Sequence, residues 1–331
     1  PLLATRAGLD LQLDAGLASH RRRFGWEGGF WLPECAWRPG LDAALARHGA
    51  AWTCLDQSRH ERGDECLAPV RTPAGPLAFT IDWTAVGWLW DMGGYPSWPG
   101  YRDFHRLSMN GLHIFRIDGG PYDAVAARER AARQADEFLA AAAARLGRYR
   151  ERTGDRGLMT FAFDCELLGH WWAEGPIWLE RVLAGAAAAG IRLVTLDRAA
   201  AERAAGTGPV REAPLPPSTW GEEKDFRTWD SPAVSDLAWG ARRLELRVAA
   251  AAAGGLDRAA AERAARELLM VQSSDWAFLD GRRQAGDYPF ERAMLHSRAA
   301  FEALQSGSGV QVDTRVRALA PDLSLAPLLV P

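Results

Sequence analysis

The sequence of 331 residues lacks several features that would place a protein in a particular class. It has no run of 18 apolar residues, so no helix is expected to cross a membrane. No signal peptide is visible, and we expect a cytoplasmic protein. Acidic residues (42) nearly balance basic residues (39), which argues against a surface for nucleic acid or another polyanion. We therefore expect neither a membrane nor a nucleic acid as a partner.

Cysteine is also scarce. The four cysteines form no C-x-x-C pair, and they are Cys35, Cys54, Cys66 and Cys165. This spacing favours free, buried thiols in a reducing compartment over disulfides or a metal site. The seven histidines form neither H-x-H nor H-x-x-x-H, and no glycine motif for phosphate or dinucleotide binding is present. The sequence therefore predicts no metal ion and no cofactor.

Tryptophan, in contrast, is abundant, with fifteen residues against five tyrosines. Several tryptophans lie in segments rich in glycine, proline and charge, which are typical of loops: Trp83, Trp88, Trp90, Trp98, Trp220 and Trp229. Tryptophans in loops favour a binding cleft over core packing. Because sugar rings stack their C–H faces on indoles, carboxylates near such residues indicate a carbohydrate site.

Two carboxylates follow short apolar runs. Residues 158–163 read as a buried strand that ends at Asp164, and a second run from Gly29 ends at Glu34. In an α/β barrel the carboxyl ends of the strands carry the chemistry. We predict that Glu34 and Asp164 come from two strands of one sheet and face each other across one pocket. The alternative for each carboxylate is a helix cap or a partner for an arginine.

The order of the predicted elements indicates an α/β protein. Up to about residue 200, helices alternate with strands, which is typical of parallel strands joined by crossover helices. The predicted helices cover 9–23, 41–48, 123–150, 177–189, 237–252, 257–272 and 288–305, and the predicted strands cover 30–34, 51–55, 77–81, 113–117, 158–163 and 191–196. Loops are predicted at 58–74 and 83–104. We predict a partial barrel over 1–204, a helical domain over 205–307 and a tail over 308–331.

A pair of carboxyl groups has a specific use in glycoside chemistry. In a retaining mechanism the two groups lie about 5–5.5 Å apart, where one attacks the anomeric carbon and the other transfers the proton. Glu34 and Asp164 fit this requirement. His170, six residues after Asp164, is either a hydrogen-bonded structural histidine or a donor to a sugar hydroxyl or a carboxylate.

Longer motifs carry a family resemblance over nearly the whole chain. WLPECAWRPG (31–40) and FDCELLGHWWAEGP (163–176) resemble two signature regions of glycoside hydrolase family 57, most closely those of 1,4-α-glucan branching enzymes. GYPSWPGYRDF (94–104), PSTWGEEKDFRTW (217–229) and QSSDWAF (272–278) resemble further regions of that family. The resemblance implies an incomplete (β/α)7-type barrel, an all-α C-terminal domain and a retaining mechanism on α-1,4-glucans such as amylose or glycogen.

The resemblance also implies individual roles, carried over by position. Glu34 matches the nucleophile and Asp164 the general acid/base. The residues that match glucan-binding positions are Trp90, Gly94, His170, Trp220, Trp229 and Asp275. The general acid must hold its proton near neutral pH, so we expect an apolar pocket or a neighbouring negative charge to raise its pKa. The implied role of such an enzyme is glycogen biosynthesis.

Three departures from the family pattern keep alternatives open. The opening strands of the barrel, with their two histidine motifs, are missing, so we expect the chain to be a fragment. No tyrosine occurs between Glu34 and Tyr95, and 58–74 is short, whereas the branching enzymes carry a longer excursion with a tyrosine at its tip. Ile81 stands where the family has an arginine. The alternatives are an α-amylase, a 4-α-glucanotransferase or an inactive glucan-binding fragment.

Overall fold

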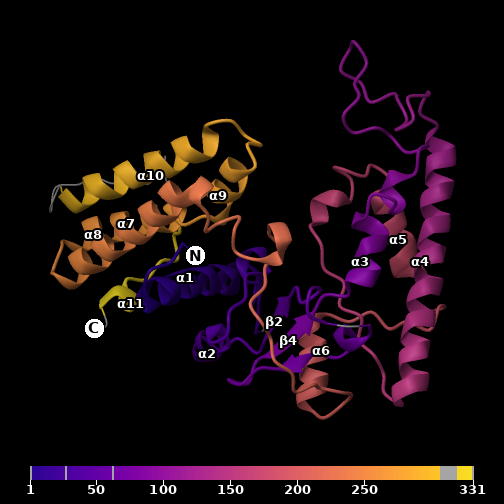
Figure 1. Ribbon diagram of the computed structural model, residues 1–331, viewed down its shortest axis with the longest axis horizontal. Helices are drawn as coiled ribbons and strands as arrows, with labels where there is room; N and C mark the ends of the chain where they lie inside the picture. Colours follow the sequence, from indigo (N-terminus) through magenta and orange to yellow (C-terminus); the bar gives the residue numbers. More distant parts are fainter. Residues whose placement is uncertain (1, 27, 62, 306–318, 330–331) are drawn as a thin grey trace. The chain divides into compact units, whose positions relative to one another are not determined.

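The computed structural model describes residues 2–26, 28–61, 63–305 and 319–329 (Figure 1). The chain divides into two compact units. The first unit contains residues 1–56, 72–76 and 215–331, and the second contains 57–71 and 77–214. The α/β fold class is confirmed, with helices that outweigh short strands. The predicted barrel and the predicted domain boundaries remain predictions, and residues 306–318, where the predicted tail begins, lie outside the described part.

The first unit combines a parallel strand pair with a group of helices. Its helices are α1 (Arg6–Phe24), α2 (Leu41–Arg47), α7 (Ser235–Ala253), α8 (Arg258–Val271), α9 (Ser274–Gly281), α10 (Tyr288–Gln305) and α11 (Ala326–Leu329). Strands β1 (Gly29–Phe30) and β2 (Trp52–Leu55) pair with Gly29 opposite Trp52 and Phe30 opposite Thr53. Short 3-10 turns follow at η1 (Pro33–Cys35), η5 (Glu222–Lys224) and η6 (Pro232–Val234).

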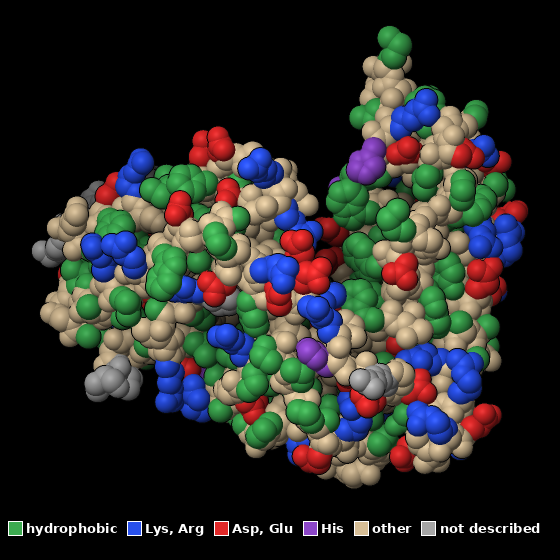
Figure 2. Space-filling model, in the orientation of Figure 1, with side chains coloured by type: hydrophobic (Ala, Val, Ile, Leu, Met, Phe, Trp, Pro, Cys, Tyr) green, Lys and Arg blue, Asp and Glu red, His purple; other side chains and the backbone are tan. Residues whose placement is uncertain are grey.

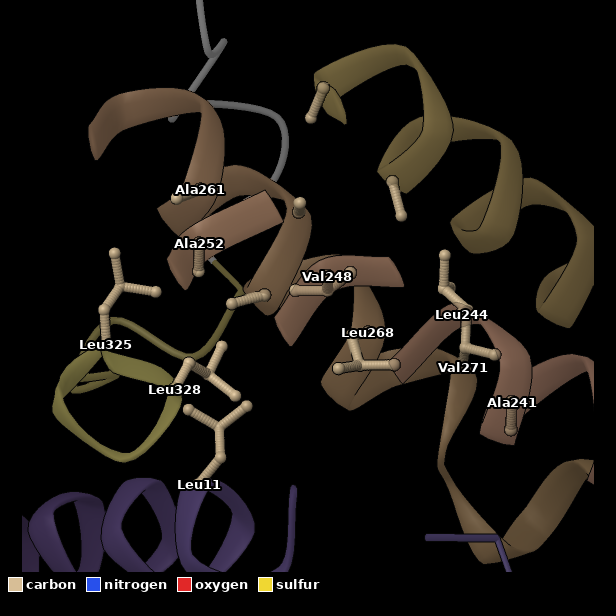
Figure 3. Close-up of a cluster of buried hydrophobic side chains, with 14 residues drawn as sticks. Leu11, Ala241, Leu244, Val248, Ala252, Ala261, Leu268, Val271, Leu325 and Leu328 are labelled. Atoms are coloured by element: carbon tan, nitrogen blue, oxygen red, sulfur yellow. The ribbon is translucent and has the colours of Figure 1, made fainter. Parts of the chain in front are cut away.

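Leucine and alanine side chains form the core between α1 and the C-terminal helices. Leu11 of α1 is fully buried and points toward Leu328 of α11 (Figure 3). Small residues such as Ala241 and Ala264 let α7, α8 and α10 approach one another closely. Since each buried leucine contributes roughly 1.5–3 kcal/mol, α1 is held mainly by this packing.

A buried carboxylate also fixes the beginning of α1. Glu245 of α7 is 0% exposed and accepts hydrogen bonds from the amide N–H groups of Ala4 (3.0 Å) and Thr5 (2.7 Å). It accepts further bonds from the Thr5 hydroxyl (2.5 Å) and the Gln272 amide (2.7 Å). Backbone N–H groups at a helix N-terminus otherwise lack partners, so Glu245 satisfies donors that α1 cannot satisfy itself.

The second unit is built around one long helix. Its helices are α3 (Trp83–Trp90), α4 (Ala124–Thr153), α5 (Gly175–Gly185) and α6 (Leu196–Ala204), with 3-10 turns η2 (Glu65–Leu67), η3 (Tyr95–Ser97) and η4 (Cys165–Leu167). Strands β3 (Val70–Arg71) and β4 (Leu77–Thr80) pair antiparallel, with Val70 opposite Ala78. The loop between α3 and α4 projects beyond the end of α4 (Figure 1).

The core of the second unit is aromatic. A buried alanine stripe on α4 precedes Phe138, whose ring packs edge-on against Trp88 of α3 (5.6 Å) and Trp178 of α5 (5.0 Å). Further along α4, Arg145 forms a buried ion pair with Asp82, with Nε 2.6 Å from Oδ2. Asp82 also caps α3 by accepting from the Thr84 N–H. These contacts hold α3 and α5 on one side of α4.

Several predicted elements are confirmed and others are wrong. The helices at 9–23, 41–48, 123–150, 177–189, 237–252, 257–272 and 288–305 correspond to α1, α2, α4, α5, α7, α8 and α10, and the strands at 51–55 and 77–81 correspond to β2 and β4. The predicted strand at 30–34 is only β1, because the chain turns at Pro33. The predicted loop at 83–104 contains α3.

The strands predicted at 113–117, 158–163 and 191–196 are not formed in the described residues. Segment 158–163 is half-buried and makes a single parallel bridge, between Thr160 and Ile81. Segment 113–117 makes isolated bridges at Phe115 and Arg116, and 191–195 leads into α6 without a ladder. A β-strand needs paired neighbours along its length, so an apolar run alone does not produce one.

None of the helices within the described residues is both apolar enough and long enough to cross a lipid bilayer.

Candidate active site

Glu34 occupies a strained position in the first unit. It lies in the centre of η1 with φ 57° and ψ 26°, and Cys35 follows with φ 50°. Two successive non-glycine residues in the left-handed region are uncommon and cost free energy, so the surrounding structure must hold them. Such strain is often found where a side chain is positioned for function. At this turn the chain leaves the direction of β1, and Glu34 is partly buried.

A second chain segment holds this turn from outside. The Glu34 carbonyl oxygen accepts a hydrogen bond from the Trp220 N–H (2.7 Å). Trp37 and Ser218 exchange two backbone hydrogen bonds, of 2.8 and 3.1 Å. The Trp220 ring meets the Trp31 ring edge-on, with centroids 4.9 Å apart. The structure therefore brings two predicted site residues, Glu34 and Trp220, into direct contact.

An ion pair lies in the same part of the first unit. Asp56, at the end of β2, is buried, and its Oδ2 lies 2.8 Å from the Nζ atom of Lys224. Lys224 belongs to η5, and both Lys224 (φ 58°) and its neighbour Glu223 (φ 55°) have left-handed backbone angles. The loop that carries Trp220 is thus tied to the strand next to β1. Sequence analysis missed this pair, because no local pattern links residues so far apart in the chain.

The electrostatic surroundings of Cys35 also reflect this arrangement. Burial raises the pKa of the Cys35 thiol far above its usual value, and the nearby Cys54, Asp56 and Glu34 raise it further. Burial likewise raises the pKa of Cys54 to about 12. Both thiols therefore remain protonated at neutral pH, and neither serves as a nucleophile.

The other predicted residues of the first unit lie apart from this turn. Trp229 is buried in a small cluster with Val234 and Ala277, and its indole N–H donates to the Ser274 carbonyl (3.0 Å). Asp275 is exposed in the first turn of α9. Their contacts with glucan stay predictions.

Asp164 lies in the second unit, at the entry to η4. Its backbone is extended (φ −67°, ψ 125°), its residue is exposed, and its side chain does not cap the turn. Partial desolvation of the carboxyl group raises the pKa of Asp164, and the negative charge of Glu166 raises it further. This direction favours the protonated acid, as a general acid requires.

The other predicted site residues of the second unit lie in loops or at the end of a helix. His170 packs its ring edge-on against Phe104 (4.8 Å) and Trp171 (4.9 Å). Trp90 is the last residue of α3 and is exposed. Gly94 has no room for a side chain, because a Cβ there would lie 2.9 Å from three carbonyl oxygens. Glu34 belongs to the first unit and Asp164 to the second, and the meeting of the two carboxylates stays a prediction.

The described part of the chain forms neither a metal-ligating cluster nor a disulfide. Across the described residues, no group of three or more His, Cys, Asp or Glu side chains could hold a metal ion. All four cysteines are free, and Cys165 is exposed whereas the other three are buried. The expectation of buried thiols is therefore correct for three of them and wrong for Cys165.

Comparison with known proteins gives consistent matches. A family model described as "1,4-alpha-glucan branching enzyme, C-terminal" matches residues 239–323. The probable 1,4-α-glucan branching enzyme Rv3031 of Mycobacterium tuberculosis is 35% identical over 96% of this chain and 63% of its own length. The crystal structure of TK1436, a GH57 branching enzyme from Thermococcus kodakaraensis in complex with glucose and additives, matches with a TM-score of 0.90 and 26% identity over 100% of this chain and 70% of that chain.

The chain is similar in sequence and in fold to branching enzymes of glycoside hydrolase family 57. A second crystal structure of a GH57-type branching enzyme, from Pyrococcus horikoshii, matches with a TM-score of 0.89 and 26% identity over 100% of this chain and 69% of that chain. The resemblance seen in the motifs is thereby confirmed. The chain spans 63% of the length of the mycobacterial branching enzyme. This similarity to branching enzymes extends over both carboxylate turns.

Proposed function

We propose that the full-length protein containing this chain is a retaining 1,4-α-glucan branching enzyme. The similarity to branching enzymes over 96% of the chain carries this proposal. Its substrate is an α-1,4-glucan of the amylose or glycogen type, and its role is glycogen biosynthesis in the cytoplasm. The glucan-binding residues of the proposal are Trp90, Gly94, His170, Trp220, Trp229 and Asp275.

In the first step of the proposed reaction, the carboxylate of Glu34 attacks the anomeric carbon of an α-1,4 linkage. Asp164 gives its proton to the glycosidic oxygen, which leaves with the shortened glucan chain. A covalent glycosyl-enzyme ester at Glu34 results. The raised pKa of Asp164 supports this assignment, because a carboxyl group must be protonated to act as the acid.

In the second step, the ionised Asp164 removes the proton from a sugar 6-hydroxyl. The oxygen attacks the anomeric carbon, an α-1,6 linkage forms, and Glu34 leaves as a carboxylate. The same ester could be taken by water or by a 4-hydroxyl, so restricted entry of water is needed for branching. The strained backbone at Glu34 supports the nucleophile assignment, because it fixes the direction of attack.

The test uses the full-length protein with amylose. Proton NMR should show new α-1,6 linkages, and Glu34→Gln should abolish turnover while glucan affinity stays nearly intact. Glu180→Gln, on the exposed face of α5, is the matched carboxylate control and should behave as the parent. Unchanged turnover in Glu34→Gln would exclude Glu34 as the nucleophile.

A second candidate is hydrolysis or linear transfer, as in an α-amylase or a 4-α-glucanotransferase. The segment between β2 and β4 favours it, because this segment is short and contains no tyrosine that could shield the ester from water. Release of reducing ends from amylose without new branch points would support this candidate against branching. Glucan binding without any turnover would instead indicate a glucan-binding protein without activity.

A further inference from the structure

A cluster of aromatic and histidine side chains lies on the surface of the second unit. Phe104 is its centre, and its ring lies 4.5 Å from Trp171, 4.8 Å from His170 and 6.3 Å from His113. His105 adds a further ring, 5.1 Å from Phe104. Figure 2 shows histidine and hydrophobic side chains together at the base of the projecting loop. None of these rings was expected to form a unit from the sequence.

Trp171 is both exposed and fixed in position. Its residue is 42% exposed, yet its indole Nε1 donates a hydrogen bond to Glu166 Oε1 at 3.0 Å. The rings of Phe104 and His170 both contact it, at interplanar angles of 50° and 74°. One hydrogen bond and two ring contacts therefore hold this exposed indole in place.

The next residue explains why Trp171 faces outward. Trp172 is 1% exposed and packs against Tyr101 and Trp178 in the aromatic core. The backbone N–H of Trp172 donates to the Leu167 carbonyl (2.9 Å), and the backbone carbonyl of Trp172 accepts from the Gly169 N–H (2.8 Å). Trp172 is thus fixed in the core, while the side chain of Trp171 lies at the surface. One tryptophan of the pair thus serves the core and the other the surface.

The loop that supplies Phe104 is anchored as well. Glu174 is buried, and its Oε1 accepts hydrogen bonds from the Tyr122 hydroxyl (2.7 Å) and the Arg102 N–H (3.2 Å). These two donors lie on either side of the projecting segment. Phe104 is therefore carried by a loop whose base is tied to the residue that precedes α5.

We propose that the face of Trp171, bordered by Phe104 and His170, binds a glucosyl ring of the α-glucan substrate. The proposal rests on the branching-enzyme function and adds to it a subsite next to the proton donor. A preorganised indole face suits the C–H face of a sugar, and the imidazole of His170 can hydrogen-bond a hydroxyl. Glu166 connects the subsite to Asp164, since it binds the indole N–H and lies within electrostatic range of that carboxyl group.

The chemistry of this surface favours a neutral sugar as its ligand. An anionic ligand is disfavoured by the carboxyl groups of Glu166 and Asp164, and a purely apolar ligand would remove the His170 imidazole from water without offering it a hydrogen bond. A neutral sugar offers both C–H faces and hydroxyl groups. The hydrogen bond from the Trp171 indole N–H to Glu166 (3.0 Å) ties the indole to a carboxylate two residues after Asp164 in the chain.

The test measures binding of maltoheptaose to the full-length protein with the Glu34→Gln background, so that the ligand is not consumed. Isothermal titration calorimetry should show affinity weakened by about 3- to 10-fold in Trp171→Ala, which corresponds to the loss of one aromatic contact. Trp239→Ala on α7 is the matched control, because Trp239 is likewise exposed (59%). Its affinity should equal that of the background protein.

Two further measurements keep the inference open to refutation. If Trp171→Ala does not fold, Trp171→Phe retains the ring contacts and loses only the indole surface and N–H, so a smaller loss of affinity is expected. With 5-fluorotryptophan incorporated, the fluorine resonance assigned by Trp171→Phe should shift when maltoheptaose is added. Unchanged affinity in the folded variant, or an unmoved resonance at saturation, overturns the subsite.

The same titration separates this inference from the proposed function. If the background protein binds maltoheptaose and Trp171 has no effect, the subsite is wrong while the glucan function stands. If the background protein does not bind maltoheptaose and wild-type protein does not act on amylose, the proposed function fails and the subsite fails with it.

Discussion

The two turns that carry Glu34 and Asp164 have similar sequences and different physical properties. In each, a carboxylate is followed directly by a cysteine of a 3-10 turn: Glu34 lies inside η1, whereas Asp164 precedes η4. At the first turn the carboxylate residue is left-handed and Cys35 is buried. At the second turn the backbone of Asp164 is extended, and both Asp164 and Cys165 are exposed.

This difference is consistent with the two roles that we propose for Glu34 and Asp164. A nucleophile needs a fixed direction of attack, and the first turn supplies it through backbone strain and the hydrogen bond from the Trp220 N–H. An acid/base must gain and lose a proton, and the second turn gives its carboxyl group access to solvent together with a raised pKa. Similar motifs therefore need not carry interchangeable carboxylates.

The largest expected effect separates the two carboxylates by leaving group. Glu34→Gln and Asp164→Asn, each in the full-length protein, should both lower turnover of amylose by roughly 10³-fold or more. With a maltosyl fluoride, whose leaving group needs no proton, Asp164→Asn should form the glycosyl-enzyme readily and Glu34→Gln should not. The measurement is fluoride release in the first turnover. Equal fluoride release from the two variants would remove the assigned roles.

The next prediction concerns the support of the first turn. Lys224→Met should destabilise the protein by about 2–3 kcal/mol, because Asp56 is a buried carboxylate and Lys224 is only partly screened by solvent. The control Arg227→Met removes an exposed partner of Asp225 in the same loop and should leave stability nearly unchanged, because solvent screens a surface ion pair. Urea unfolding followed by tryptophan fluorescence checks both. Equal midpoints would show that the ion pair does not hold the loop.

Cys35 of the first turn is buried and Cys165 of the second is exposed, so the two thiols should react at different rates. In the folded protein at neutral pH, a maleimide should label Cys165 at least about 100-fold faster than Cys35, since Cys35 is 0% exposed and its pKa is raised by burial. Mass spectrometry of tryptic peptides at several times measures the two rates. Cys165→Ser should remove the fast phase, and rapid labelling of Cys35 would show that the first turn opens.

The smallest expected effect is a shift in pH dependence. Asp164 must be protonated in the first step, so activity should fall as pH rises through its folded pKa. Glu166→Gln keeps an acceptor for the Trp171 N–H and removes the negative charge, so the pKa of Asp164 should fall and the basic limb of the profile should move to lower pH. Glu180→Gln should leave that limb in place. A basic limb that stays or moves upward in Glu166→Gln would contradict this coupling.

The raised pKa of Asp164 also makes the stability of the folded protein depend on pH. The folded pKa of Asp164 is raised above its unfolded value, mainly by desolvation. The protonated form is therefore favoured in the folded state, and the stability it contributes is fully present below the unfolded pKa. That contribution is lost as pH rises through the folded pKa.

Local patterns in the sequence predicted the long elements well. Helix α4 has a strong apolar period and ends at Gly154, whose φ of 79° suits glycine, so its extent could be read from the chain. The same reading failed for 158–163, because whether an apolar run becomes a strand depends on partners that lie far away in sequence. Helix α3 was missed, because its eight residues contain three tryptophans and lead into a segment rich in glycine and proline, which resembles a loop.

The site was only partly readable for the same reason. Motif resemblance pointed to Glu34, Asp164 and Trp220, and the structure adds how the first of these is held. The Trp220 N–H bonds its carbonyl, and the loop that carries Trp220 is tied by Lys224 to Asp56, 168 positions away in the chain (224 − 56). The aromatic cluster likewise joins Phe104 to Trp171 through a loop whose fold the sequence does not announce.

The contact between Glu245 and the start of α1 has a consequence for how the protein is made. Thr5 and Glu245 are 240 positions apart, so α1 leaves the ribosome long before the carboxylate that receives its first amide groups. Until α7 emerges, α1 also lacks the leucine and alanine surface that covers Leu11. The nascent α1 is therefore a segment that a chaperone would be expected to shield, and slowed translation ahead of α7 should prolong its exposure.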